Sequence, residues 1–254
     1  MTEQHKYWGF WATVGFSLLV VIVFVVTQSI AVIVYALYSK GWDISALNQS
    51  YLAKLAFNGD AISFAEIPSA FISIALIALF IILRNSTSIR DYLHLNLPKP
   101  LTLIKWLGIM LLTIIGMEML NTVLERETPK FMNDVSSSTN NMVLLWIAIV
   151  IAAPLFEECL FRGFLFEGLR HSPVGVAGTI AITSAGWAAL HLQYAWFEIG
   201  MIFLFGILFS IAKLKTHSLW IPIAMHMMMN LLASVFMALT TDETVPVSPA
   251  GIIY

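Results

Sequence analysis

The residue types best suited to chemistry gather in three short segments of the C-terminal half, and each segment interrupts an apolar stretch. Two carboxylates and a guanidinium occur in the first segment, and imidazole and carboxamide groups occur in the other two. Buried carboxylates and histidines can deprotonate water, and N–H donors can stabilise a developing oxyanion. The candidate site residues are Glu157, Glu158, Arg162, His191, His226 and Asn230.

The spacing within the first segment separates the roles of its two adjacent acids. On a helix, Glu158 and Arg162 share a face, in the order that favours an ion pair. Glu157 lies about 100° round the helix from Glu158 and can point elsewhere. Burying each charged group in lipid costs roughly 2.5–3.5 kcal/mol on insertion scales. One Glu–Arg pair could simply join two helices, but the second acid then remains uncompensated, which indicates a function.

The other two segments each place a pair of residues at i and i+4, which is one helical face. The pairs are Trp187 with His191, and His226 with Asn230. Alone, a buried histidine or asparagine often serves only as a hydrogen-bonding residue between helices. The complete set on three neighbouring helices favours a function, because intramembrane ionisable residues usually mark functional sites.

Two versions of the chemistry stay open for this set. A carboxylate and an imidazole can activate water while a second histidine and an asparagine stabilise an oxyanion, which is what hydrolysis of a peptide bond requires. The same residue types could instead hold a divalent metal such as zinc, and the candidate ligands are Glu157, His191 and His226. We therefore expect either no cofactor or a divalent metal.

These residues must be positioned by helices embedded in a membrane. Of 254 residues, 59% are hydrophobic and 11% are charged, against about 45–50% and 25% in a soluble domain. Spanning helices need about 20 mostly apolar residues. The predicted fold class is all-α, a polytopic transmembrane bundle of about seven spanning helices, with six to eight as the range. The expected spans are 10–38, 67–83, 103–123, 142–165, 176–193, 196–212 and 218–239.

Charge and cysteine content exclude several other classes. A net charge of −2 argues against a nucleic-acid partner, which would require a basic face. The single cysteine, Cys159, excludes an internal disulfide and a cysteine-based zinc cage. Eight Lys and Arg residues fall on one predicted side of the membrane and four on the other. The majority side is expected to be cytoplasmic, which places the N-terminus inside and the C-terminus outside a plasma or inner membrane.

The three segments together resemble a known family. Glu157-Glu158-x-x-x-Arg162, an aromatic-x-x-x-His at 187–191, and His226-x-x-x-Asn230 are similar to the three motifs of the CPBP family. That family comprises CAAX prenyl endopeptidases of the Rce1 type, bacteriocin-processing and bacteriocin-immunity proteins, and the bacterial Abi proteins. The resemblance covers roughly residues 140–240. It suggests N-terminal transmembrane helices and loops at 1–135, a catalytic helical core at 136–240 and a C-terminal tail at 241–254.

The resemblance implies an intramembrane endopeptidase with a polar cavity among its helices. Glu157 and His191 would activate the water, and His226 and Asn230 would stabilise the oxyanion. Glu158 and Arg162 would orient the first acid. Members are described both as metalloproteases and as metal-free glutamate proteases, so the resemblance leaves the cofactor open. The chain departs from the motif at Trp187, where the family has phenylalanine.

We therefore expect hydrolysis of a peptide bond in a membrane-associated peptide or protein. A prenylated C-terminus is one candidate substrate, and membrane lipid is the expected surrounding partner. The alternative is a non-enzymatic membrane binding or immunity protein, or a small proton-coupled transporter. A transporter should contain a repeated topology with broken helices, and the sequence shows no such repeat.

Overall fold

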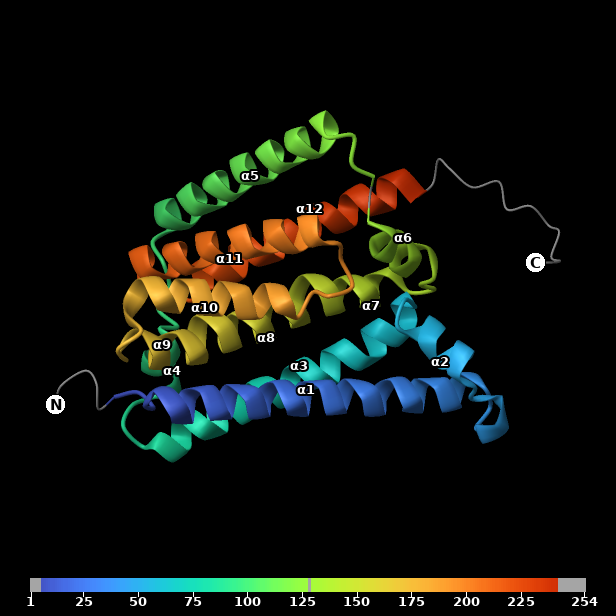
Figure 1. Cartoon of the computed structure of the whole chain (residues 1–254), viewed down its shortest axis with the longest axis horizontal. Coiled ribbons are helices and arrows are strands. Elements are labelled where there is room, and N and C mark those ends of the chain that lie inside the picture. The colour runs from blue at the N-terminus through green and yellow to red at the C-terminus, as the bar shows by residue number, and fades with distance from the viewer. Residues whose placement is uncertain (1–5, 128, 242–254) are drawn as a thin grey trace.

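The computed structural model describes residues 6–127 and 129–241, which form a bundle of helices without a strand (Figure 1). Within these residues, six helical segments are long and apolar enough to cross a membrane. The predicted all-α polytopic bundle is therefore confirmed. The six segments are α1 (Phe10–Ser39), α3 (Gly59–Arg84), α5 (Pro100–Val123), the continuous run Met142–Arg170, α11 (Trp196–Thr216) and α12 (Trp220–Thr241).

The predicted span 176–193 is not among these six segments, because the helix there is too short. Helix α10 (Gly175–Ala189) has 15 residues, or about 22 Å of helix, whereas a hydrocarbon core is about 30 Å thick. It packs lengthwise beside α11 (Figure 1). The helix ends before the predicted residue 193, because the last turn tightens: the N–H of His191 bonds to the carbonyl of Ala188 at 3.0 Å. His191 therefore lies beyond the helix and not on its face.

Helix α3 begins earlier than its apolar stretch predicts. The Asn58 side chain accepts a hydrogen bond from the N–H of Ala61 at 2.9 Å, which caps the helix at Gly59. In the next position, Asp60 accepts hydrogen bonds from Thr139 at 2.8 Å and from the Asn140 side chain at 2.6 Å. The early start places Glu66 inside the span.

The shorter connecting helices are η2 (Ile44–Ala46), α2 (Gln49–Leu55), α4 (Ile89–Leu93) and α6 (Lys130–Ser137).

The run Met142–Arg170, which carries the first polar segment, alternates between α and π geometry. It consists of α7 (Met142–Trp146), a π-helical stretch, α8 (Ala153–Glu158), a second π-helical stretch and α9 (Phe166–Arg170). Single π-helical turns inside α-helices occur frequently at functional sites. Pro154 lies at the first junction, and because it has no N–H it leaves carbonyl groups of the preceding turn without a helical donor.

The two parts into which the sequence was divided share one hydrophobic core. Val20 of α1 and Ile77 of α3 lie in the same buried cluster as Phe156 of α8 and Phe209 of α11. The division at residues 135 and 136 stays a prediction. Residues 242–254, most of the predicted C-terminal tail, lie outside the described residues.

A buried cluster of charged residues around Glu167 changes the count of loop Lys and Arg residues from which the orientation in the membrane is predicted. The Lys213 side chain is 1% exposed and pairs with Glu167, which is fully buried. Arg170 Nε lies 2.7 Å from Glu167 Oε2, and His94 Nδ1 lies 3.6 Å from Glu167 Oε1. Lys213 lies in the last turn of the spanning helix α11 and not in a loop, so it does not belong among the loop charges on which the predicted orientation depends. The cytoplasmic N-terminus stays a prediction.

We expect Gly168→Ala to destabilise the bundle by about 1–3 kcal/mol, because added volume in a packed contact forces strain. A methyl group at Gly168 of α9 would lie 2.7 Å from Cβ of Thr13 in α1, and closer still to the threonine hydroxyl. Thermal unfolding in detergent measures the effect. The matched control is Gly116→Ala in α5, where a methyl group meets no atom within 4 Å. Equal melting temperatures for the two variants would contradict the close α1–α9 contact.

Candidate active site

Glu158 and Arg162 form the buried ion pair that their spacing predicts. Arg162 Nη1 donates to Glu158 Oε1 at 2.9 Å, and both side chains are completely buried. The guanidinium also lies over two aromatic rings, with its Cζ atom 4.5 Å from the Trp187 centroid and 5.3 Å from the Phe209 centroid. Gly206 of α11 leaves the room for it, since a Cβ there would lie 3.0 Å from Arg162 Nη2.

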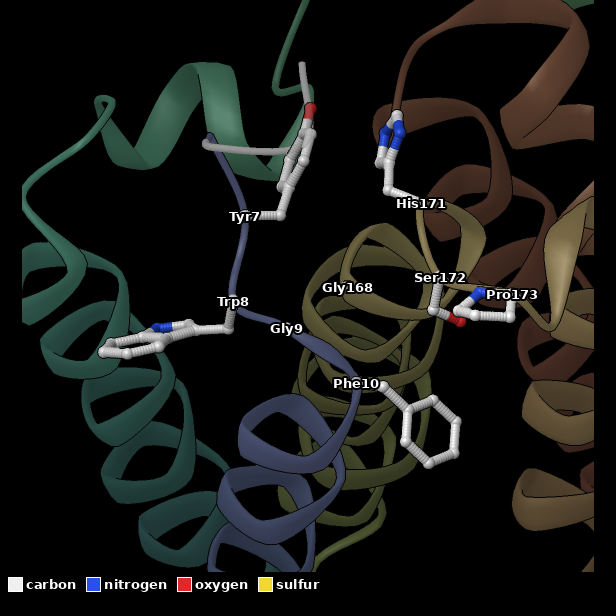
Figure 2. A pocket seen from close by; sticks show the side chains of 8 residues that line it. All are labelled: Tyr7, Trp8, Gly9, Phe10, Gly168, His171, Ser172 and Pro173. Carbon is white, nitrogen blue, oxygen red and sulfur yellow. The ribbon is translucent and has the colours of Figure 1, made fainter. Parts of the chain in front are cut away.

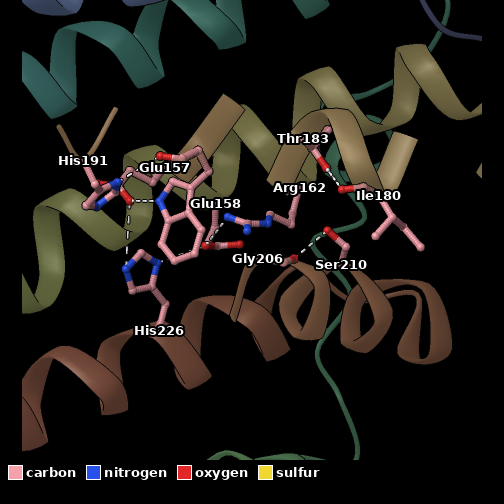
Figure 3. A network of polar contacts seen from close by, with 10 residues as sticks. Glu157, Glu158, Arg162, Ile180, Thr183, His191, Gly206, Ser210 and His226 are labelled. Atoms are coloured by element: carbon pink, nitrogen blue, oxygen red, sulfur yellow. Dashed lines mark hydrogen bonds and ion pairs between the residues drawn. The ribbon is translucent and has the colours of Figure 1, made fainter. Parts of the chain in front are cut away.

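His226 of α12 joins this pair to the second acid. Its Nδ1 lies 2.9 Å from Glu158 Oε1, and its Nε2 lies 3.9 Å from Glu157 Oε2 (Figure 3). Because a carboxylate accepts hydrogen bonds, the proton belongs on Nδ1, and Nε2 faces Glu157. The His226 side chain is only 3% exposed. His226 is thereby oriented by Glu158 and directed at Glu157.

Glu157 is the accessible acid of the two. Its side chain is 18% exposed, whereas that of Glu158 is completely buried. Its Oε2 accepts a hydrogen bond from the indole Nε1 of Trp187. No lysine or arginine pairs with Glu157 within the described part of the chain. The two adjacent acids thus have different environments, as their spacing on the helix predicts.

His191 reaches the site from the turn that follows α10. Its Nδ1 lies 2.9 Å from the carbonyl oxygen of Trp187, and its ring centroid lies 5.3 Å from the Trp187 ring at a steep angle. A carbonyl oxygen only accepts, so Nδ1 carries the proton and Nε2 is the free basic nitrogen. Both His191 and Glu157 contact Trp187, and Figure 3 shows their side chains at the same end of the polar network.

Asn230 lies one turn after His226 and makes a different contact. Its Nδ2 donates to the carbonyl oxygen of Ile149 at 2.7 Å. In a π-helical turn that carbonyl would bond to the residue five positions later, and this residue is Pro154, which has no N–H. Asn230 therefore replaces the missing donor and ties α12 to the run that carries both acids. Among its described contacts there is no direct bond to the other five candidates.

The predicted metal ligands are not gathered into one set by this arrangement. Within residues 6–127 and 129–241, no three His, Cys, Asp or Glu side chains are grouped so that they could hold a metal ion. Glu157 and His226 face each other, and the bond from Nδ1 of His191 to a carbonyl oxygen leaves its Nε2 open. The expected choice between no cofactor and a divalent metal stays a prediction.

Comparison with known proteins places the site within a recognised family segment. The part of the chain from 139 to 232 matches the family described as type II CAAX prenyl endopeptidase Rce1-like. Residues 139–232 are therefore similar to this family. This match confirms the resemblance found from the three motifs, and the matched segment contains all six candidate residues. The similarity thus falls within a chain whose described residues include six helices long and apolar enough to cross a membrane.

The other comparisons extend this result only slightly. An Escherichia coli protein described as an uncharacterized 24.3 kDa protein is 30% identical over 138 residues. The alignment covers 52% of this chain and 64% of that protein's own length. No solved structure matches the chain.

Two further polar residues near the candidate site were not predicted as site residues. Glu66 of α3 is 8% exposed and interacts electrostatically with Glu157. The helix cap at Asn58 was the signal that could have placed Glu66 inside the span.

Tyr194 is the second of these residues, and it follows α10, outside the spanning helices. Burial and the negative charges of Glu157 and Glu198 raise the pKa of Tyr194 to about 12, so its hydroxyl stays protonated and can donate.

We expect Trp187→Phe to lower kcat roughly 10- to 100-fold, because a hydrogen bond to a charged group contributes about 1.5–3 kcal/mol. Phenylalanine keeps an aromatic ring under Arg162 but removes the N–H that bonds to Glu157. Steady-state cleavage kinetics at saturating peptide measure the effect. Trp196→Phe is the matched control, since Trp196 is 85% exposed. An unchanged kcat for Trp187→Phe would show that the indole does not position Glu157.

Proposed function

We propose that the protein is an intramembrane endopeptidase in which Glu157 activates the water molecule that attacks a peptide bond. The observation that carries this proposal is the unequal environment of the two acids. Glu158 is buried and neutralised by Arg162, whereas Glu157 is partly exposed and held by an indole N–H. The position of both acids in the Rce1-like segment supports the same assignment.

In the proposed reaction, water attacks the carbonyl carbon as Glu157 accepts its proton, and His191 assists through its free Nε2. The resulting oxyanion accepts hydrogen bonds from Asn230 and from His226, which acts here as an imidazolium with one proton on Nδ1 and a second on Nε2. The carboxamide of Asn230 has two N–H donors, and Ile149 uses one of them. The C–N bond then breaks, and the proton held by Glu157 passes to the leaving nitrogen, which restores the carboxylate.

We propose a membrane-associated peptide or protein as the substrate, with a prenylated C-terminus as one candidate. Glu157 lies near the middle of the spanning run Met142–Arg170. A peptide must therefore reach well into the bilayer to be cut. A segment that does so must be sufficiently apolar, because each unsatisfied backbone group in lipid costs several kcal/mol.

We expect Asn230→Ala to lower kcat about 10²- to 10³-fold, the usual effect of removing one oxyanion donor. The bond to Ile149 is lost as well, so thermal unfolding must be measured beside the kinetics. Ser234→Ala is the matched control, because Ser234 lies one turn further along α12 and its hydroxyl bonds only to the Asn230 carbonyl. If Asn230→Ala lowers stability alone, Asn230 has a purely structural role.

Reconstitution in liposomes distinguishes the peptidase from the non-enzymatic alternatives. Purified wild-type protein should cleave peptides from a digest of host membrane proteins. In ¹⁸O-water, each new C-terminus should carry the heavy isotope, as hydrolysis requires. Proton flux driven by a pH gradient, with no peptide cleaved, would favour the transporter instead. A protein that shows neither activity would favour a binding or immunity role.

The cofactor requires a separate measurement. Metal analysis of the purified protein, together with cleavage before and after treatment with a chelator, decides between the two versions. Activity that persists in metal-free protein would establish the metal-free mechanism. Stoichiometric zinc that is lost together with activity would establish a metalloprotease.

A further inference from the structure

Glu66 is a buried acid that the reaction above does not use. It lies in the spanning helix α3 and is 8% exposed. Its Oε2 accepts a hydrogen bond from Gln28 Nε2 of α1 at 2.5 Å, and its Oε1 has no hydrogen-bond partner. No ion pair compensates Glu66 in the described part of the chain. An unpaired carboxylate in a membrane is costly, and such residues usually serve a function.

The position of Glu66 brings it to the candidate site from the opposite side. The N-terminal part of α3 lies between α1 and α8 in Figure 1, and α3 packs against α8, which carries Glu157. Glu66 interacts electrostatically with Glu157. His226 approaches the same acid from α12. The N-terminal half, which lies outside the Rce1-like segment, therefore contributes a polar group beside the accessible acid.

We infer that the Gln28–Glu66 pair is part of the active site, where Glu66 Oε1 accepts a hydrogen bond from the water that Glu157 deprotonates. A water molecule has two O–H donors, and two neighbouring carboxylates can each accept one of them. Gln28 fixes the other oxygen of Glu66, so that Oε1 keeps one orientation.

This inference rests on the proposed function and adds a water-positioning residue to it. Glu66 gains no proton in the reaction and loses none. One O–H bond of the water points to Glu66 and stays intact in the first step, while the other transfers its proton to Glu157. Fixing both O–H bonds directs a lone pair of the oxygen at the substrate carbonyl. Misplacement of a reacting group by about 1 Å can cost 10²-fold in rate.

The test compares Glu66→Leu and Glu66→Gln in purified, reconstituted protein. We expect Glu66→Leu to lower kcat about 10- to 100-fold while KM changes less than about twofold, since Glu66 contacts the water and not the peptide. Glu66→Gln keeps an acceptor oxygen and should retain more of the rate than Glu66→Leu. Glu66→Leu should also melt at the same or a higher temperature than wild type, because it removes a buried polar atom that has no hydrogen-bond partner.

Glu118→Leu is the matched control, because Glu118 is an exposed acid in the spanning helix α5. It should change neither kcat nor KM. A wild-type kcat for Glu66→Leu would overturn the inference. A loss of activity that follows a fall in melting temperature, with Glu66→Gln no better than Glu66→Leu, would also overturn it and assign Glu66 to the fold alone.

An infrared measurement separates this inference from the proposed function. The carboxyl band of Glu66 is identified as the difference between wild type and Glu66→Gln, and it is then recorded in Glu157→Gln. We expect the band to shift, since the shared water loses one of its two acceptors. If wild type cleaves no peptide but the band shifts, the proposed function fails and the contact between the two acids remains. An unmoved band overturns the shared water, whether or not the protein cleaves.

Discussion

Glu157→Gln should lower kcat for peptide cleavage about 10²- to 10⁴-fold, which is the usual contribution of a general base. Glutamine has nearly the same shape and keeps an oxygen that can accept from the Trp187 indole. The variant should therefore fold normally, bind peptide with nearly unchanged affinity and fail in the chemical step. Single-turnover cleavage at saturating peptide measures that step directly.

Glu118→Gln is a fitting control for this experiment, since it makes the same substitution at an exposed acid in α5. Peptide binding to the Glu157→Gln protein provides a second control, because it should persist where cleavage does not. Wild-type cleavage by a folded Glu157→Gln protein would exclude Glu157 as the base.

Arg162→Met should destabilise the protein by about 3–5 kcal/mol, because it leaves a buried carboxylate without its cation. Glu158 and Arg162 are both completely buried. No other lysine or arginine pairs with Glu158 among the described residues. Thermal and denaturant unfolding in detergent measure the loss. Activity should fall as well, since Glu158 orients His226.

A double variant tests whether the loss comes from the uncompensated charge. Glu158→Gln together with Arg162→Met removes both charges and should be more stable than Arg162→Met alone. The matched surface control is Arg126→Met. Its partner is Glu198, their side chains are 37% and 20% exposed, and the expected change is within about 1 kcal/mol. A double variant no more stable than the single one would show that Arg162 acts through packing instead.

The sequence predicts the relations within each helix better than the relations between helices. Periodicity places Glu158 and Arg162 on one face and turns Glu157 away, and the structure has both features. The same periodicity contains no information on which helices pack together. The contacts of Glu158 with His226 and of Asn230 with Ile149 arise from tertiary packing.

Helix ends explain the remaining differences. The apolar stretch of α3 predicts a start at residue 67, but the Asn58 cap starts the helix at Gly59 and brings Glu66 into the bundle. At the other end of the site, α10 stops at Ala189, so His191 is held by a turn. Helix caps and tight last turns depend on single hydrogen bonds, and the lengths of apolar stretches give no information on these bonds.

The most direct test of the central claim compares membrane peptides from cells that express wild type with those from cells that express Glu157→Gln at equal abundance. Quantitative mass spectrometry of termini in the membrane fraction shows both the cleavage and its substrate. An intramembrane endopeptidase should generate new termini in wild-type cells, with the uncut precursor accumulating in Glu157→Gln cells. Identical terminal peptides in both, from folded protein at equal levels, would contradict hydrolysis by Glu157.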